Sequence, residues 1–127
     1  MAAGSVERSF KVSADQAWDA VGDFAGVDKI FTELESLEMV DGDRVIGMMG
    51  LKIREKLVAR DEAARSITYS VIDGVPLERH EATIKVDEAG DGCQITWSFD
   101  VAPDEMLPIF EATYSGALES VSKVLEG

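Results

Sequence analysis

The sequence predicts an α+β fold in which a long C-terminal helix covers one face of a curved antiparallel sheet. Two observations carry this prediction. Between residues 34 and 102, short runs that alternate apolar and polar residues are separated by turn sequences, as in a meander of antiparallel strands. After Pro103, apolar residues recur at three- and four-residue steps, which is the spacing of one face of a helix.

The N-terminal part is expected to form a strand followed by two short helices. Alternating apolar positions predict a strand over residues 6–12. Ser13, with Gln16 three residues later, has the spacing of a capping box and predicts the start of a short helix. We expect Gly26 to end this helix, and residues 27–31 to form a further helical turn.

Six consecutive antiparallel strands are expected before residue 103. Four turn-like sequences separate alternating runs: "DGD" at 41–43, "RDEAAR" at 60–65, "DGVP" at 73–76 and "EAGDG" at 88–92. The alternation that assigns side chains to one face is clear over residues 51–59, 66–71, 79–86 and 94–101. It is unclear in "LESLEMV" and "RVIGMMG", so the inward residues of those strands are not assigned.

The long C-terminal helix is expected to begin near Leu107. Pro108 is tolerated only in the first turn of a helix, and the acidic residues Asp104 and Glu105 favour a helix N-terminus. The apolar stripe of this helix would face the sheet. Its members are Met106, Phe110, Tyr114, Ala117, Leu118, Val121 and Leu125.

Length and charge limit the classes of function that are plausible for this chain. Its 127 residues are enough for one domain with a substantial core, which we expect to span residues 1–127. The formal net charge is −13 at pH 7, which repels phosphate backbones and anionic lipid surfaces. We therefore expect no nucleic-acid partner, no membrane insertion, and a monomer or weak homodimer.

Cysteine and histidine usage argues against a metal site or a cofactor. The chain has one cysteine, Cys93, and one histidine, His80, which excludes an internal disulfide and a multi-thiolate metal site. No glycine-rich phosphate loop is present, so we expect neither metal nor cofactor. The first ten residues lack a basic segment followed by an apolar run, which predicts a cytoplasmic protein.

Two predicted strands carry an ionisable residue on their apolar side. Glu55 shares its parity with the apolar residues of "LKIREKLVAR", and His80 shares its parity with those of "LERHEATIKV". Burying a lone carboxylate costs several kcal/mol, so an inward Glu55 needs water, a partner or a ligand beside it. A hydrated ligand cavity would meet this need, and so would a direct Glu55–His80 pair or a position at the rim of the sheet.

The order of elements, with "VSADQAWDAVGDF", "ITWSFDVAP" and "SGALESVSKVLEG", resembles the START-related superfamily. This superfamily, also described as SRPBCC or Bet v 1-like helix-grip proteins, includes polyketide cyclases, lipid-transport proteins, pollen allergens and plant abscisic-acid receptors. The resemblance covers nearly the whole chain. It implies a helix-grip fold, with a seven-stranded antiparallel sheet wrapped around the C-terminal helix and a ligand cavity between them.

The resemblance also implies roles for particular residues. "REKL" is similar to the receptor segment "RERL", whose glutamate faces the cavity, which places Glu55 there. Gly50-Leu51 and residues 73–78 correspond to the gate and latch loops of the receptors, and His80 follows the latch. The chain has Lys52 in place of the gate proline and "TEL" at 32–34 near the place of the receptors' ligand-anchoring lysine. Hormone reception is therefore not implied.

Two functions follow as hypotheses. The first is binding or transport of a hydrophobic small molecule, such as a lipid, a polyketide or an aromatic metabolite, in the internal cavity. The ligand-binding residues would be Glu55, Tyr69, His80, Trp97, Phe99, Phe110 and Tyr114. The alternative is a polyketide cyclase or dehydratase in which His80 and Glu55 act as general base and acid, and we favour a non-enzyme.

The inward Glu55 also predicts two properties. Because no inward Lys or Arg can be assigned, ligands should be neutral or basic rather than carboxylates. Replacing Glu55 with leucine should cost little stability, since the change removes the cost of burying a charge.

Overall fold

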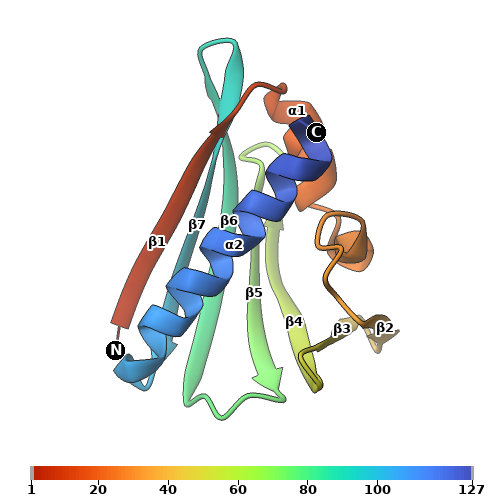
Figure 1. The fold of residues 1–127 in the computed structure, drawn as a ribbon, viewed down its shortest axis with the longest axis vertical. Coiled ribbons are helices and arrows are strands. Elements are labelled where there is room, and N and C mark those ends of the chain that lie inside the picture. Colours follow the sequence, from red (N-terminus) through yellow and green to blue (C-terminus); the bar gives the residue numbers. More distant parts are fainter. Residues whose placement is uncertain (1, 127) are drawn as a thin grey trace.

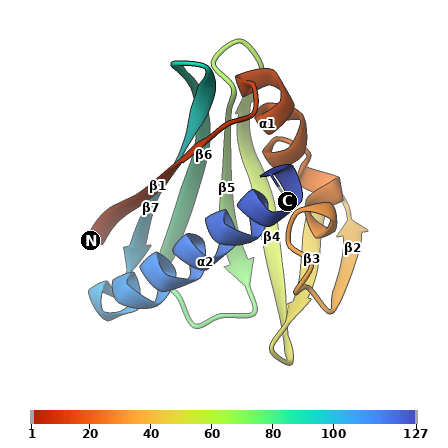
Figure 2. The ribbon, with the colours of Figure 1, turned by 45° about the horizontal axis from the view of Figure 1, so that its top comes forward.

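The computed structural model describes residues 2–126, which form a seven-stranded antiparallel sheet with the strand order β1-β7-β6-β5-β4-β3-β2. The sheet curves around the long helix α2, which crosses its concave face (Figures 1 and 2). The predicted helix-grip fold is confirmed. The elements are β1 (Ala2–Phe10), α1 (Ala14–Val21), the 3₁₀ helix η1 (Phe24–Lys29), β2 (Ser36–Val40), β3 (Asp43–Met48), β4 (Leu51–Asp61), β5 (Ser66–Asp73), β6 (Arg79–Ala89), β7 (Gly92–Ala102), the 3₁₀ helix η2 (Asp104–Met106) and α2 (Leu107–Glu126).

The six consecutive strands β2 to β7 are joined as predicted, each paired with the next. Asp41 and Gly42 have φ values of 52° and 86°, and Met49 and Gly50 have φ values of 50° and 78°. Two residues with positive φ form the tight turns whose twist matches that of paired strands. The second of these turns explains why "RVIGMMG" could not be assigned, since its first turn residue is a methionine.

The short helices begin as predicted but are divided differently. The hydroxyl of Ser13 accepts a hydrogen bond from the Gln16 amide at 3.1 Å, which is the predicted cap of α1. The helix ends at Val21, so the prediction that Gly26 ends it is wrong. The Asp23 carboxylate accepts a hydrogen bond from the Gly26 amide at 3.1 Å and thereby caps η1, so a new helical segment starts before Gly26.

The C-terminal helix starts at Leu107, as predicted, with Pro108 in its first turn. Its C-terminal end is tied to the N-terminal part of the chain. Arg8 of β1 donates to the Ser122 hydroxyl at 3.3 Å, and the Lys11 amide donates to the Glu126 carboxylate at 3.1 Å. Tyr114, Leu118 and Val121 of the predicted stripe are buried against the sheet, whereas Met106 belongs to η2.

The predicted side-chain alternation holds on β5, β6 and β7 and fails in part on β4. Every second residue of β6 from His80 to Val86 is buried. On β4, Leu51 is 45% exposed and Ala59 is also exposed, although both were expected on the apolar side. The register shift between Leu57 and Ala59, which leaves Val58 as an extra residue on β4, accounts for Ala59, because a bulge rotates the strand locally. Leu51 is the first residue of β4, directly after the Met49-Gly50 turn, where its pairing with Met48 is regular.

The backbone ladder between β5 and β6 covers only part of the two strands. It runs from the pair Ser66–Lys85 to the pair Tyr69–Ala82. Beyond this point β5 continues along β4 to Asp73, while β6 begins at Arg79 beside β7. The two strands therefore separate at one end of the sheet.

The 73–78 segment that joins these strands lies against the start of β4. Gly74 has a φ of 97°, and a Cβ atom on it would lie 2.0 Å from the Lys52 carbonyl oxygen. The segments corresponding to the latch and gate loops therefore touch through a position that only glycine can occupy.

Replacing Gly74 with alanine is expected to lower the free energy of unfolding by more than the roughly 1–2 kcal/mol of a positive φ alone. The added methyl group must also push the 73–78 segment away from β4. Gly50→Ala is the matched control, because Gly50 has a φ of 78° but open space around its Cβ position. Urea unfolding of both variants measures the difference, and equal losses would show that the close approach has no energetic weight.

Candidate functional site

Six of the predicted ligand-binding residues form one cluster between the sheet and α2. We call Tyr69, His80, Trp97, Phe99, Phe110 and Tyr114 the aromatic cluster. Trp97 and Tyr114 are stacked, with ring centroids 4.3 Å apart. His80 lies 5.0 Å from Phe110, and Phe99 lies 5.1 Å from Tyr114. Tyr69 joins through His80, at 5.8 Å.

All members of the cluster are buried except Phe110, which is partly buried. The alternation on β5, β6 and β7 and the apolar stripe on α2 therefore predicted their inward orientation correctly. Phe31, after η1, contacts Trp97 at a centroid distance of 5.8 Å and was not predicted as a site residue. Phe31 lies in a segment whose sequence pattern does not show which side chains point inward.

His80 joins three elements through its imidazole ring. Its Nδ1 accepts a hydrogen bond from the Val71 amide of β5 at 3.0 Å, and its Nε2 lies 2.7 Å from the Tyr114 hydroxyl of α2. Because an amide can only donate, Nδ1 is the unprotonated nitrogen, so Nε2–H donates to Tyr114. The Ser70 hydroxyl also donates to the His80 carbonyl oxygen. These bonds hold β5 to β6 where the backbone ladder has ended.

Burial shifts the protonation of this site toward neutral forms. Removal from water lowers the pKa of His80 from 6.5 to about 4. Burial, and then the negative charge of Glu55, raises the pKa of Tyr69, and the pKa of Tyr114 is raised by burial first and then by Tyr69 and Glu55. At neutral pH the imidazole and both hydroxyl groups are therefore uncharged.

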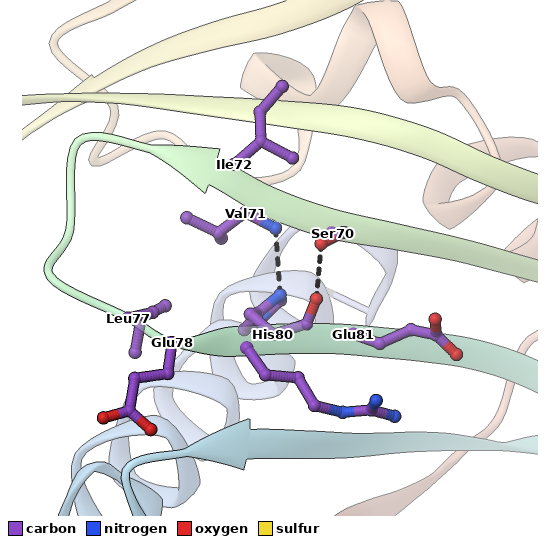
Figure 3. A pocket seen from close by; sticks show the side chains of 8 residues that line it. Ser70, Val71, Ile72, Leu77, Glu78, His80 and Glu81 are labelled. Carbon is purple, nitrogen blue, oxygen red and sulfur yellow. Dashed lines mark hydrogen bonds between the residues drawn. The ribbon is translucent and has the colours of Figure 1, made fainter.

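A pocket of about 580 Å³ lies where β5 and β6 separate, and His80 forms part of its wall. Figure 3 shows Ser70 and Val71 on one strand facing His80 on the other, with the 73–78 segment closing the end. The pocket is lined by Ser70, Val71, Ile72, Leu77, Glu78, Arg79, His80 and Glu81. His80 thus borders the pocket on one side and contacts Phe110 and Tyr114 of the aromatic cluster on the other.

Glu55 is inward, as predicted, but its partner is an arginine that the sequence left unassigned. Arg44 of β3 donates to the Glu55 carboxylate at 2.6 Å, and both residues are 6% exposed. Arg44 also donates to the Phe24 carbonyl oxygen at 3.1 Å. Its guanidinium lies 4.2 Å from the centroid of the Phe24 ring and 4.9 Å from that of Tyr69. Glu55 therefore neither pairs with His80 nor lies at the rim of the sheet.

Arg44 removes the premise of one prediction. The expected preference for neutral or basic ligands assumed that no inward cation accompanies Glu55, and Arg44 is such a cation. The pairing register of β3 and β4 identifies Arg44 as the partner, because Arg44 and Glu55 are directly opposite each other across this hairpin. That register depends on the Met49-Gly50 turn, which lacks a strong turn sequence.

The aromatic cluster fills the region where a ligand cavity was predicted. Tyr114 of α2 stacks directly on Trp97 of β7, and Phe110 covers His80, so the helix and the sheet are in contact through their rings. A further pocket of about 280 Å³ is lined by residues at the β3–β4 turn and the start of β2. An internal ligand cavity stays a prediction.

The geometry of the site favours hydrogen bonding to a ligand over abstraction of a proton from it. His80 accepts from Val71 at one nitrogen and donates at the other, so it offers no free lone pair to a substrate. The Glu55 carboxylate is engaged by Arg44. Within residues 2–126, no group of three or more His, Cys, Asp or Glu side chains is arranged to hold a metal ion.

Comparisons with known proteins agree with the geometry. The family model described as polyketide cyclase / dehydrase and lipid transport matches residues 1–126. A search of curated proteins finds no match. Among helices in the described part of the chain, none is both long and apolar enough to cross a membrane.

Solved structures share the fold at low sequence identity. XoxI from Bacillus cereus has a TM-score of 0.90 at 22% identity, over 97% of this chain and 94% of that chain. Ara h 8.0201 has a TM-score of 0.79 at 21% identity, over 99% of both chains. The di-domain ARO/CYC BexL from the BE-7585A biosynthetic pathway has a TM-score of 0.83 at 14% identity, over 99% of this chain and 47% of that chain.

Proposed function

Because the chain belongs to the polyketide cyclase / dehydrase and lipid transport family, we propose that it binds a hydrophobic small molecule between the sheet and α2. The ligand would contact the aromatic cluster and use His80 and Tyr114 as polar points. Glu55 would act through Arg44, which contacts the Tyr69 ring. Such a site is sufficient for a carrier or a sensor, because neither function requires catalytic groups.

The observation that carries this proposal is the position of His80. It forms part of the wall of a pocket of about 580 Å³ and hydrogen-bonds Tyr114 inside the aromatic cluster. The volume of this pocket lies within the roughly 300–1,000 Å³ of small-molecule pockets. Its own lining is mostly polar, with Ser70, Glu78, Arg79, His80 and Glu81 beside three apolar residues, so the apolar surface for a ligand would come from the aromatic cluster. The gap between β5 and β6 is therefore a suitable entrance, with the aromatic cluster behind it.

Binding would require the N-terminal half of α2 to move away from the sheet. Side-chain hydrogen bonds to Arg8 and Lys11 hold the C-terminal end of this helix. Its first turns contact the sheet through Phe110, which is only partly buried, and through the Tyr114–His80 hydrogen bond. A flat ligand can replace the apolar contact of Phe110, and a polar group on that ligand can replace the partner in the hydrogen bond.

Native mass spectrometry of the protein purified from its native organism tests this function. We expect a bound small molecule at a ratio of one per chain, and retention of that molecule by Ile109→Glu. Phe110→Glu should lose it, because a charge would replace an apolar contact in the cluster. Ile109 is the matched control, since it is the neighbouring residue and is 55% exposed. Recovery of ligand-free wild type that also takes up nothing from a cell extract would contradict the proposal.

The cyclase or dehydratase alternative receives less support from the geometry. Both candidate groups are engaged, His80 by Val71 and Tyr114 and Glu55 by Arg44. The co-purified molecule, supplied at substrate concentration, distinguishes the two functions. If wild type converts the molecule, and His80→Ala binds it normally but does not convert it, the protein is an enzyme and not a carrier.

A further inference from the structure

Trp97 contains a buried hydrogen-bond donor without an acceptor. Its side chain is 3% exposed, and no acceptor among residues 2–126 meets its Nε1–H with hydrogen-bond geometry. Leaving a buried donor unsatisfied costs about 1–3 kcal/mol, and such groups are rare in native proteins. The other tryptophan, Trp18, donates its Nε1–H to the Glu62 carboxylate at 2.8 Å. The unsatisfied donor is therefore a property of the cluster and not of tryptophan in this chain.

The groups around Trp97 are also donors. His80 Nε2–H donates to the Tyr114 oxygen, which leaves the Tyr114 proton to be donated in turn. Tyr114 and the Trp97 indole each act to lower the pKa of Tyr69, against the larger effect of burial, but the Trp97 Nε1–H meets no acceptor with hydrogen-bond geometry. Each of these neighbours of Trp97 therefore carries a proton of its own, and the Nε1–H is left without an acceptor.

The carboxylate that could supply a further acceptor is engaged elsewhere, since Glu55 accepts from Arg44. Its charge nevertheless reaches the cluster, because it raises the pKa of both tyrosines more strongly than Arg44 lowers them. A second negative charge beside these hydroxyl groups would be unfavourable. The acceptor that Trp97 lacks is therefore expected to be a neutral group.

We propose that the Trp97 indole N–H binds the carbonyl oxygen of the ligand, so that the site selects flat aromatic ketones over hydrocarbons of the same shape. The stacking of Trp97 and Tyr114, with an interplanar angle of 17°, defines the plane that such a ligand would extend or share. This inference rests on the proposed function and adds the chemical class of the ligand.

Two probes of equal shape test it by calorimetric titration. 2-Acetonaphthone carries a carbonyl oxygen where 2-isopropenylnaphthalene carries a methylene group. Wild type should bind the ketone about threefold to tenfold more tightly, which is the value of one hydrogen bond. Trp97→Phe should bind both equally, because it keeps an aromatic ring and loses the N–H. Trp18→Phe, the matched control, should keep the wild-type preference.

A second measurement does not depend on the folding of Trp97→Phe. The chain has two tryptophans, so Trp18→Phe leaves one indole N–H signal in a ¹⁵N–¹H spectrum. The ketone should move this signal in the direction of a new hydrogen bond, and the hydrocarbon should not. Equal affinity for both probes, or a preference that survives in Trp97→Phe, overturns this inference and leaves the proposed function standing. Failure of both probes to bind overturns the inference, and absence of a co-purified molecule as well overturns the proposed function.

Discussion

Replacing Glu55 with leucine is expected to lower the free energy of unfolding by about 3–5 kcal/mol, because it leaves the buried Arg44 guanidinium without its counter-charge. The two groups are 2.6 Å apart and each is 6% exposed, so water cannot replace the lost carboxylate without opening the core. This reverses the expectation from sequence that Glu55→Leu costs little. That expectation treated Glu55 as an isolated charge.

A double variant separates the ion pair from the burial of Glu55 itself. Arg44→Leu/Glu55→Leu should recover most of the lost stability, since replacing both partners with apolar groups removes two desolvation costs together with the attraction. Asp15→Ala is the control for an exposed pair, because Asp15 binds Arg65 with its side chain 81% exposed, and it should cost at most about 1 kcal/mol. Urea unfolding provides all the values. A single Glu55→Leu variant as stable as wild type would refute the role of Arg44.

Acidification from pH 6.5 to pH 4 is expected to remove about 2–3 kcal/mol of stability through His80 alone. The pKa of this residue falls from 6.5 in its ordinary state to about 4 in the folded protein. Between these values the unfolded chain binds a proton that the folded protein does not, so stability decreases as the pH falls. Well above pH 6.5 both states are neutral and this contribution is constant. Protonation of Nδ1 would also break the hydrogen bond from the Val71 amide.

The His80→Gln variant isolates this effect from the titration of carboxylates. Its unfolding free energy at several pH values between 4 and 7.5 is subtracted from that of wild type, so that groups shared by the two proteins cancel. The difference should level off toward pH 7.5 and shrink as the pH falls toward 4. A difference that does not change with pH would mean that His80 titrates normally in the folded protein.

The fold could be predicted from sequence because each element depends on local pattern. Strand alternation at period two assigned Tyr69, His80 and Trp97 to the interior, and the three- and four-residue spacing on the last helix did the same for Tyr114. These assignments require no knowledge of which strand pairs with which. Where a strand contains a bulge, as β4 does between Leu57 and Ala59, alternation fails within one residue, and Ala59 was misassigned for this reason.

The contacts within the site could not be predicted in the same way, since they depend on register between elements. The partner of Glu55 follows from the β3–β4 pairing, and the partner of His80 Nδ1 is a backbone amide that becomes available only where the β5–β6 ladder ends. Neither feature can be recognised from the composition or from the periodicity of apolar residues. The unsatisfied Trp97 donor is similar, because a pattern that places an indole inside says nothing about the acceptors around it.

The pairing of β1 with β7 has a consequence for the order of events during synthesis. Residues 2–10 pair with residues 93–101, so the first strand made must wait for the last one before it can join the sheet. At a ribosomal rate of about 5–20 residues per second, this delay lasts roughly 5–20 seconds. Pairing between residues so far apart in sequence also slows folding once the chain is complete. During this interval the apolar face that α2 later covers is open to solvent, and exposed apolar surface and unpaired strand edges are prone to aggregation.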